Sequence, residues 1–290
     1  MAKQWVDSRK GLRVENGDSS SIDMRALKRK VSLFFKNNAR AAVRATGFDL
    51  VRYASQERGS ASEFPPDFEP HHRSIINAVK ERTMTSPERL FSLIEAVHYI
   101  IRREIPGSIV ECGVWRGGSM MAAALTLKSL NVRTRDLHLF DTFEGMPKPR
   151  DVDADTWGNS ALPLFAETRV GEDSSDLFRA MLPDVQMGMA STGYDRERIH
   201  FHKGKVERTI PDAAPGEIAI LRLDTDWYES TRHELEHLYP RLSPGGILIV
   251  DDYGHWRGSR KATDEYIEKY APTLFLGRID YTGRIAVKTV

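Results

Sequence analysis

The chain has 290 residues, which is enough for one large α/β domain with an appendage or for two small domains. Its 42 lysines and arginines nearly cancel its 41 aspartates and glutamates, so no overall field indicates a nucleic-acid partner. No apolar run approaches the ~18–20 residues of a membrane-spanning helix, the N-terminus lacks the apolar core of a secretion signal, and the single cysteine, Cys112, suits a reducing compartment. The sequence therefore predicts a cytoplasmic protein without stable membrane insertion.

Residues 1–75 differ in composition from the rest and are predicted to form an N-terminal extension. Its polar, poorly patterned start is expected to be mobile. Residues 24–45 place apolar side chains at helical spacing among lysines and arginines, which predicts a basic amphipathic helix. We expect this helix to pack on the protein or on a second subunit of a homo-oligomer, and a membrane-surface role remains open. The stretch "SEFPPDFEPHH" is interpreted as a Pro-rich connector or flap.

Strand and helix signals alternate in residues 76–290. "SPERLFSLIEAVHYIIRRE" predicts a helix with Ser86 as its N-cap and Pro87 in its first turn. Short apolar strands follow in "SIVECGV", "DLHLFD", "RIHFHKG", "EIAILRLD" and "GGILIVDD", separated by helices such as "STRHELEHLYPRL" and "SRKATDEYIEKYA". Two β runs with no helix between them, "TLFLGRID" and "RIAVKTV", end the chain. This order predicts a doubly wound, mostly parallel sheet with an antiparallel terminal strand, and the long insertion at 151–198 is predicted to be a lid.

The first strand passes into a helix through "VECGVWRGGSM". Glycines allow the backbone to approach a ligand closely, and a helix that begins at or near Ser119 would offer free N–H groups. The spacing of Gly113 and Gly117 is not that of the dinucleotide-binding G-x-G-x-x-G. The next strand ends in Asp141, at about the separation expected of a ribose-binding carboxylate. A cap on the following segment is the alternative role for Asp141. Taken together, the elements predict a site for an adenosine-containing cofactor.

The class of adenosine cofactor is narrowed by missing motifs. The chain has neither the Tyr-x-x-x-Lys of short-chain dehydrogenases nor the G-x-x-x-x-G-K-[ST] of P-loop proteins. The glycine turn, the acidic residue inside the strand and the strand-end acid resemble instead the S-adenosylmethionine site of class I methyltransferases, which have a Rossmann-like fold. This resemblance implies a set of cofactor-binding residues: Glu111, Gly113, Gly117, Ser119, Asp141, Thr142 and Phe143.

Two later strands each end in a pair of carboxylates. "ILRLDTDWYEST" ends in Asp224 and Asp226, and "GGILIVDDYGHWRG" contains Asp251 and Asp252. If these strands are neighbours, four negative charges meet at one edge of the sheet. Like charges a few Å apart oppose each other's ionisation, so this edge is expected to hold something positive. Carboxylate oxygens without a neighbouring His or Cys cluster suit Mg²⁺ better than zinc.

Residues 85–290 resemble the macrocin O-methyltransferase (TylF-type) family. The resemblance rests on "VECGVWRGGS", "FDTFEGMP", "LRLDTDWYESTRHELEHLYPRLSPGGILIVDDYG" and "GSRKATDEYI", and on "FHKGKVERTIP", where Ile210 replaces a leucine. It implies an S-adenosylmethionine- and Mg²⁺-dependent enzyme that methylates a sugar hydroxyl of a natural-product glycoside or polysaccharide. It also implies metal ligation by Asp224, Asp251 and Asp252 and a general base at Asp226. The N-terminal region, which in this family helps to form the acceptor pocket and the subunit contacts, matches less clearly.

Several alternatives stay open at this point. Asp226 follows Asp224 by two residues, on the same side of an extended strand end, and could serve as the base or only orient the acceptor. His255 could touch the acceptor or lie on the surface. The acceptor could be a catechol or another aromatic vicinal diol, which the same metal could chelate. A protein that binds the cofactor without catalysis is a third possibility, although such a protein has no need of four strand-end carboxylates.

Overall fold

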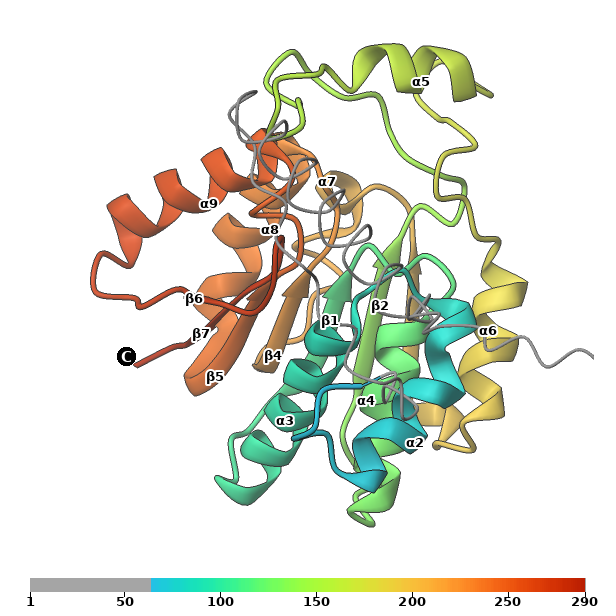
Figure 1. Cartoon of the computed structure of the whole chain (residues 1–290), viewed down its shortest axis with the longest axis vertical. Coiled ribbons are helices and arrows are strands. Elements are labelled where there is room, and N and C mark those ends of the chain that lie inside the picture. The colour runs from blue at the N-terminus through green and yellow to red at the C-terminus, as the bar shows by residue number, and fades with distance from the viewer. Residues whose placement is uncertain (1–63, 290) are drawn as a thin grey trace, which may run out of the picture. The chain divides into compact units, whose positions relative to one another are not determined.

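The structure is a computed structural model that describes residues 64–289. The mobile start and the basic helix predicted from the sequence lie outside these residues, and so does the subunit contact expected of that helix. At the centre lies a seven-stranded sheet with the order β3-β2-β1-β4-β5-β7-β6 (Figure 1). The strands are β1 (Ser108–Cys112), β2 (Leu137–Asp141), β3 (Ile199–Lys203), β4 (Ile218–Leu223), β5 (Leu242–Val250), β6 (Gly277–Arg278) and β7 (Arg284–Val287).

Strands β1 to β5 are parallel, and β7 is antiparallel to both of its neighbours, β5 and β6. The predicted doubly wound sheet with an antiparallel end is therefore confirmed. The predicted terminal strand "TLFLGRID" is much longer than the two residues that pair in β6. Phe275, in the unpaired part, is 86% exposed, so its β propensity finds no surface to pack against.

Helices cover both faces of the sheet (Figure 1). The helices of the described residues are α2 (Pro70–Val79), α3 (Pro87–Arg102), α4 (Gly118–Ser129), α5 (Leu162–Thr168), α6 (Leu182–Ser191), α7 (Val206–Thr209), α8 (Tyr228–Leu238) and α9 (Arg257–Tyr270), with 3₁₀ turns η1 (Lys80–Arg82), η2 (Arg196–Arg198) and η3 (Tyr239–Arg241). Successive strand residues alternate between the two faces. Ile109 and Ile220 belong to the core under α2, α3 and α4, whereas Val110 and Leu221 belong to the core under α8.

Two helices near the start of the described chain show how local signals fix helix ends. The predicted cap of α3 is confirmed, because the Ser86 hydroxyl accepts a hydrogen bond from the backbone N–H of Arg89; such a cap contributes about 1 kcal/mol. Helix α2 was not predicted. The stretch "FEPHH" belongs to the predicted Pro-rich connector, yet Pro70 stands in the first turn of α2, where a missing N–H costs nothing. Helix α2 runs across residue 75, where the N-terminal extension was predicted to end.

The insertion at 151–198 has two parts. Helix α6 packs against α4 and completes one face of the body, whereas α5 and the segments around it lie beyond the carboxyl ends of the strands (Figure 1). The second part is placed as a lid would be, and lid function stays a prediction. Among the helices of residues 64–289, none is long and apolar enough to cross a membrane.

Candidate active site

A cavity of about 280 Å³ opens at the carboxyl ends of β1, β2, β4 and β5. Parallel sheets bind ligands at this edge. The cavity brings together most of the residues that the sequence singled out, from both the glycine turn and the acid pairs: Gly113, Ser119, Asp141, Thr142, Asp224, Asp226, Asp251 and Asp252. Three other predicted cofactor residues do not line it: Glu111, Gly117 and Phe143. Phe143 is buried, and its ring packs edge-on against Phe201.

The glycine turn joins β1 to α4 under tight steric constraints. Gly113 has a φ of +81°, and a Cβ built there would lie 1.9 Å from the backbone carbonyl oxygen of Asp224. Gly117, with a φ of +86°, is the N-cap of α4. Both positions favour glycine because side chains rarely adopt these angles. The turn therefore presents bare backbone and the start of α4 to the cavity.

The carboxylate of Asp141 organises this turn. One of its oxygens accepts hydrogen bonds from the backbone N–H groups of Val114 (2.7 Å) and Trp115 (3.0 Å), and the other accepts one from Phe143 (2.7 Å). Burial raises the pKa of Asp141, and these hydrogen bonds oppose the rise. Asp141 thus caps backbone N–H groups, which was the alternative role considered for it from the sequence. It also lines the cavity. A carboxylate has further lone pairs that ribose hydroxyls could use.

A buried arginine lies beneath the acid pairs. Arg222 of β4 stands opposite Glu111 of β1 in the strand register, and the two side chains form an ion pair. The same guanidinium contacts carboxylate oxygens of Asp224 at 2.7 Å and Asp251 at 2.6 Å. Its side chain is only 3% exposed. Glu111, predicted to bind the cofactor, is therefore engaged in the charge network below the cavity.

A second guanidinium reaches the same cluster from α3. Arg89 forms ion pairs with Asp251 and, at 3.0 Å, with Asp280 in the turn between β6 and β7. The positive charge that the acid pairs require is thus supplied in part by the chain itself. Neither arginine was predicted from the sequence to belong to the site. For Arg222 a signal existed, because a lone charged residue in an otherwise apolar central strand needs a partner.

The remaining charge fits a divalent cation. Five carboxylates, those of Glu111, Asp224, Asp226, Asp251 and Asp252, meet only two guanidiniums among the described residues. Asp224, Asp251 and Asp252 each offer an oxygen, and these oxygens lie within 4.8 Å of one another. Burial raises the pKa of all three, that of Asp251 to about 6. A dication on these hard oxygen ligands would replace the protons that the cluster otherwise takes up.

Asp226 departs from the predicted extended geometry. Its φ is +63°, so the chain turns after β4, and its backbone N–H donates a hydrogen bond to the Asp252 carboxylate at 3.2 Å. Positive φ at a non-glycine residue is unusual and is often found at active sites. Burial, and then the charge of Asp224, raise the pKa of Asp226 to about 7. A carboxylate with this pKa is suited to proton transfer near neutral pH.

Aromatic side chains gather beside His255 at the edge of the cavity. His255 lines it, and its ring nitrogen Nδ1 lies 3.2 Å from the Tyr281 hydroxyl. The exposed Trp157 packs edge-on against His255 and stacks on Tyr281. Trp227, by contrast, is buried, and its indole N–H donates to the carbonyl oxygen of Pro147. Of these groups, the exposed Trp157 face and His255 are the ones placed to meet a ligand.

Comparisons with known proteins agree with this geometry. The sequence pattern of the macrocin-O-methyltransferase (TylF) family matches residues 35–286. A 4'-O-methyltransferase from Streptomyces olivaceus that acts on 8-demethyl-8-(2,3-dimethoxy-alpha-L-rhamnosyl)-tetracenomycin-C is 36% identical over 201 residues, which cover 69% of this chain and 73% of that protein. The mycinamicin III 3''-O-methyltransferase of Micromonospora griseorubida is 35% identical and covers 69% of this chain and 76% of its own length.

Solved structures show the same fold. The structure of the O-methyltransferase NovP superposes with a TM-score of 0.63 at 31% identity, covering 72% of this chain and 83% of that one. The calicheamicin methyltransferase CalS11 superposes with a TM-score of 0.53 at 18% identity, covering 77% and 93%, and so supports the fold alone. The family pattern matches most of the chain, two relatives named as O-methyltransferases are more than 30% identical to it, and the fold is that of an O-methyltransferase. The chain therefore belongs to the macrocin O-methyltransferase (TylF) family and is an O-methyltransferase.

Proposed function

We propose that this O-methyltransferase transfers the methyl group of S-adenosylmethionine to a sugar hydroxyl of a natural-product glycoside or polysaccharide, and that it requires Mg²⁺. One observation carries the proposal: a single cavity is lined both by the glycine turn with Asp141 and by the four strand-end aspartates. The names of relatives support the acceptor class, because they specify a rhamnosyl tetracenomycin, mycinamicin III and demethyldecarbamoylnovobiocin.

The chemistry explains why these features belong together. Attack of an alkoxide on a sulfonium methyl group converts two opposite charges into neutral products, so a site that excludes bulk water favours it. Holding the acceptor oxygen in line with the methyl carbon supplies much of the rate. We assign the holding of the donor to the glycine turn, the start of α4 and Asp141. We assign the acceptor sugar to the aromatic group at the edge of the cavity, formed by Trp157, His255 and Tyr281.

Asp226 is the proposed general base. It is buried beside the other acids, and its unusual backbone conformation is fixed by the hydrogen bond from its N–H to Asp252. With a pKa of about 7 in the absence of a metal ion, its carboxylate can accept the acceptor's proton as the new C–O bond forms. An orienting role without proton transfer is the alternative, and the two roles are separated by the pH profile of turnover, whose acid limb depends on Asp226 only if it is the base.

The metal would be held by Asp224, Asp251 and Asp252. When bound, Mg²⁺ would lower the pKa of a hydroxyl that it contacts and fix that hydroxyl's direction. The chain's own contribution is to hold the ligands. Arg222 contacts Asp224 and Asp251 from below, and Arg89 contacts Asp251 from α3. Such outer contacts orient ligands and tune a metal site.

The test follows methyl transfer from labelled S-adenosylmethionine to a panel of glycosides and catechols, with and without a chelator. Asp252→Asn removes a metal ligand, and Asp226→Asn removes only the base. The matched control is Asp212→Asn, because Asp212 is exposed and does not line the cavity. We expect chelation to abolish transfer, Asp252→Asn to raise the Mg²⁺ requirement, and Asp226→Asn to lower turnover by ~10²–10⁴-fold without rescue by excess Mg²⁺.

Each part of the proposal can fail separately. Full activity of the chelated wild-type protein would contradict the metal requirement. Rescue of Asp226→Asn by excess Mg²⁺ would make Asp226 a ligand and not a base. Transfer to catechols but to no glycoside would replace the acceptor class, and transfer to neither would contradict the proposed activity.

A further inference from the structure

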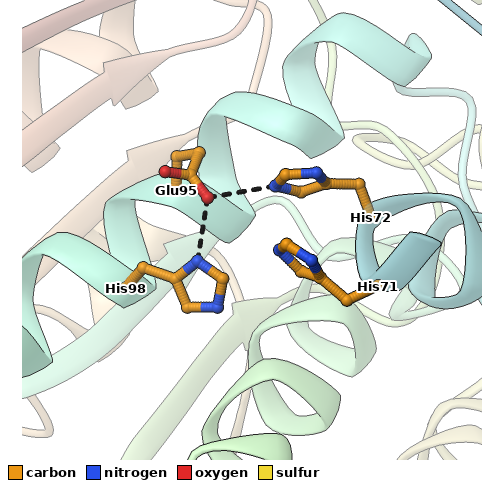
Figure 2. A group of neighbouring side chains, drawn as sticks. All are labelled: His71, His72, Glu95 and His98. Carbon is orange, nitrogen blue, oxygen red and sulfur yellow. Dashed lines mark hydrogen bonds and ion pairs between the residues drawn. The ribbon is translucent and has the colours of Figure 1, made fainter. Parts of the chain in front are cut away.

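Four side chains of types that can ligate a metal ion gather between α2 and α3. They are His71 and His72 of α2 and Glu95 and His98 of α3 (Figure 2). Each offers one nitrogen or oxygen atom, and these atoms lie within 4.8 Å of one another. The Glu95 carboxylate is the centre of the group, because one of its oxygens lies 3.0 Å from His72 Nε2 and 2.8 Å from His98 Nδ1.

Hydrogen bonding fixes the role of His72. Its Nδ1 accepts the backbone N–H of Glu69 at 3.0 Å, as part of the cap of α2. A neutral imidazole that accepts at Nδ1 carries its proton on Nε2. His72 Nε2 therefore donates to Glu95 and has no free lone pair for an ion. This is the arrangement of an outer partner that orients a ligating carboxylate.

The other three side chains can offer lone pairs to an ion. In the metal-free protein His98 Nδ1 donates its proton to Glu95, and a shift of that proton to Nε2, to which no other described residue is hydrogen-bonded, frees Nδ1 for an ion. Figure 2 shows a ring nitrogen of His71 directed toward Glu95 and His98. Within residues 64–289 no hydrogen bond ends on the His71 ring, whose contacts are with the rings of His72 and His98. Burial, followed by the two neighbouring histidines, lowers the pKa of His71, so its imidazole is neutral at pH 7. Burial alone would raise the pKa of Glu95, but hydrogen bonds from His72 and His98 lower it overall, so its carboxylate is ionised.

From this geometry we propose that His71, Glu95 and His98 bind a divalent transition-metal ion of the Zn²⁺, Co²⁺ or Ni²⁺ class, with His72 holding Glu95 in place. Ligand atoms about 2.0–2.2 Å from one ion, in adjacent positions, lie about 3 Å apart, which is the separation found between Glu95 and His98. Imidazole and carboxylate ligands suit such ions, whereas Mg²⁺ prefers oxygen ligands alone. Because His71 is exposed, water can fill the remaining coordination positions.

The site is distinct from the cavity. His98 follows Arg89 by nine residues on α3, which corresponds to roughly 13 Å along the helix axis. None of the four side chains lines the cavity. An ion bound here would instead connect α2 to α3, in addition to the packing of Phe91 against His72 of α2 and its stacking on Phe68, just before α2. The expected role is to fasten the first described helix to the body of the protein.

The experiment titrates Co²⁺ into the full-length chain after metal removal, with excess Mg²⁺ present to occupy oxygen-ligand sites. Binding is followed by calorimetry and by the visible absorption of Co²⁺ with nitrogen ligands. His71→Ala and His98→Ala test the ligands, and His72→Ala tests the outer partner. His237→Ala is the matched control, because His237 lies on α8 beside His233, a histidine pair without a carboxylate in the group.

We expect one Co²⁺ per chain with the wild-type protein and with His237→Ala. His72→Ala should bind ~10–100-fold more weakly, the usual cost of losing an outer partner, and His71→Ala and His98→Ala should lose more than that. Because His71 is exposed, its variant should keep the circular dichroism of the wild type. Two results would overturn the proposal: no Co²⁺ with nitrogen ligation in the wild type, or equal affinity in the wild type and a correctly folded His71→Ala variant. Neither result bears on methyl transfer.

Discussion

Replacing Arg222 by methionine tests whether the buried charge network stabilises the fold. The Arg222 and Glu111 side chains are 3% and 1% exposed. The other Glu111 oxygen has no hydrogen-bond partner among the described residues, so Arg222→Met leaves Glu111 buried without any partner. Removing one member of a buried ion pair typically costs about 3–5 kcal/mol. In a protein of this size, where 1 kcal/mol shifts the melting temperature by about 2–4 °C, we expect a fall of roughly 6–20 °C.

The assay is urea unfolding followed by circular dichroism, with a thermal melt as a second measure. A double variant, Glu111→Leu with Arg222→Met, separates the cost of leaving Glu111 buried without a partner from the cost of replacing the arginine side chain itself. Replacing both partners of a buried pair by apolar residues is often neutral, so the double variant should regain at least half of the lost free energy of unfolding. Asp224 and Asp251 also lose a partner, so recovery should be incomplete.

Two outcomes would refute this reasoning. One is a cost below about 1 kcal/mol for Arg222→Met, which would place the pair in the range of exposed ion pairs. The other is a double variant no more stable than the single one, which would show that Glu111 does not depend on Arg222.

Three other predictions follow from the cavity. Gly113→Ala should abolish folding or lower activity at least ~10²-fold, because its Cβ would meet the Asp224 carbonyl; soluble yield and activity check this against Gly216→Ala, whose Cβ meets nothing within 4 Å. Asp141→Ala should weaken S-adenosylhomocysteine by ~1.5–3 kcal/mol in calorimetry, and unchanged affinity would remove Asp141 from the site. Turnover should fall as the pH drops through the pKa of Asp226, which bound Mg²⁺ would place below its metal-free value of about 7, because Asp226 then takes up the proton that a base must lack; this acid limb of the pH profile should vanish in Asp226→Asn.

Local patterns predicted most of the sheet and several helices. The five parallel strands are short apolar runs between helices, and Ser86 with Pro87 marks the start of α3. Where the prediction failed, tertiary packing and strand pairing decided the structure, and not the local sequence pattern. "TLFLGRID" has strand-forming residues, but only Gly277 and Arg278 of it find a partner in β7. The insertion at 151–198 carries no clear periodicity, so its division into α6 on the body and α5 beyond the strand ends could not be anticipated.

The acidic residues of the site could be predicted from the sequence more fully than the arginines that contact them. Topology sends the carboxyl ends of parallel strands to one edge, which is why Asp224 and Asp251 could be placed together from the sequence. Arg222 and Glu111 could have been paired as well, since each is the charged residue in a buried strand and they face each other in register. Arg89 could not, because helix packing brings it to Asp251 across 162 positions of sequence, and no local pattern records that contact.

The β6–β7 hairpin has a consequence for how the site is assembled during synthesis. Asp280, in the turn of this hairpin, accepts hydrogen bonds from Ser86 and from Arg89, which precedes it by 191 positions, and Thr282 lines the cavity. Strand β7 must insert between β5 and β6 to hold that turn in place. A growing chain therefore cannot complete the arginine contacts of the acid cluster until the β6–β7 hairpin has emerged from the ribosome. A premature stop that removes β7 should leave Arg89 without the Asp280 turn and the protein without activity.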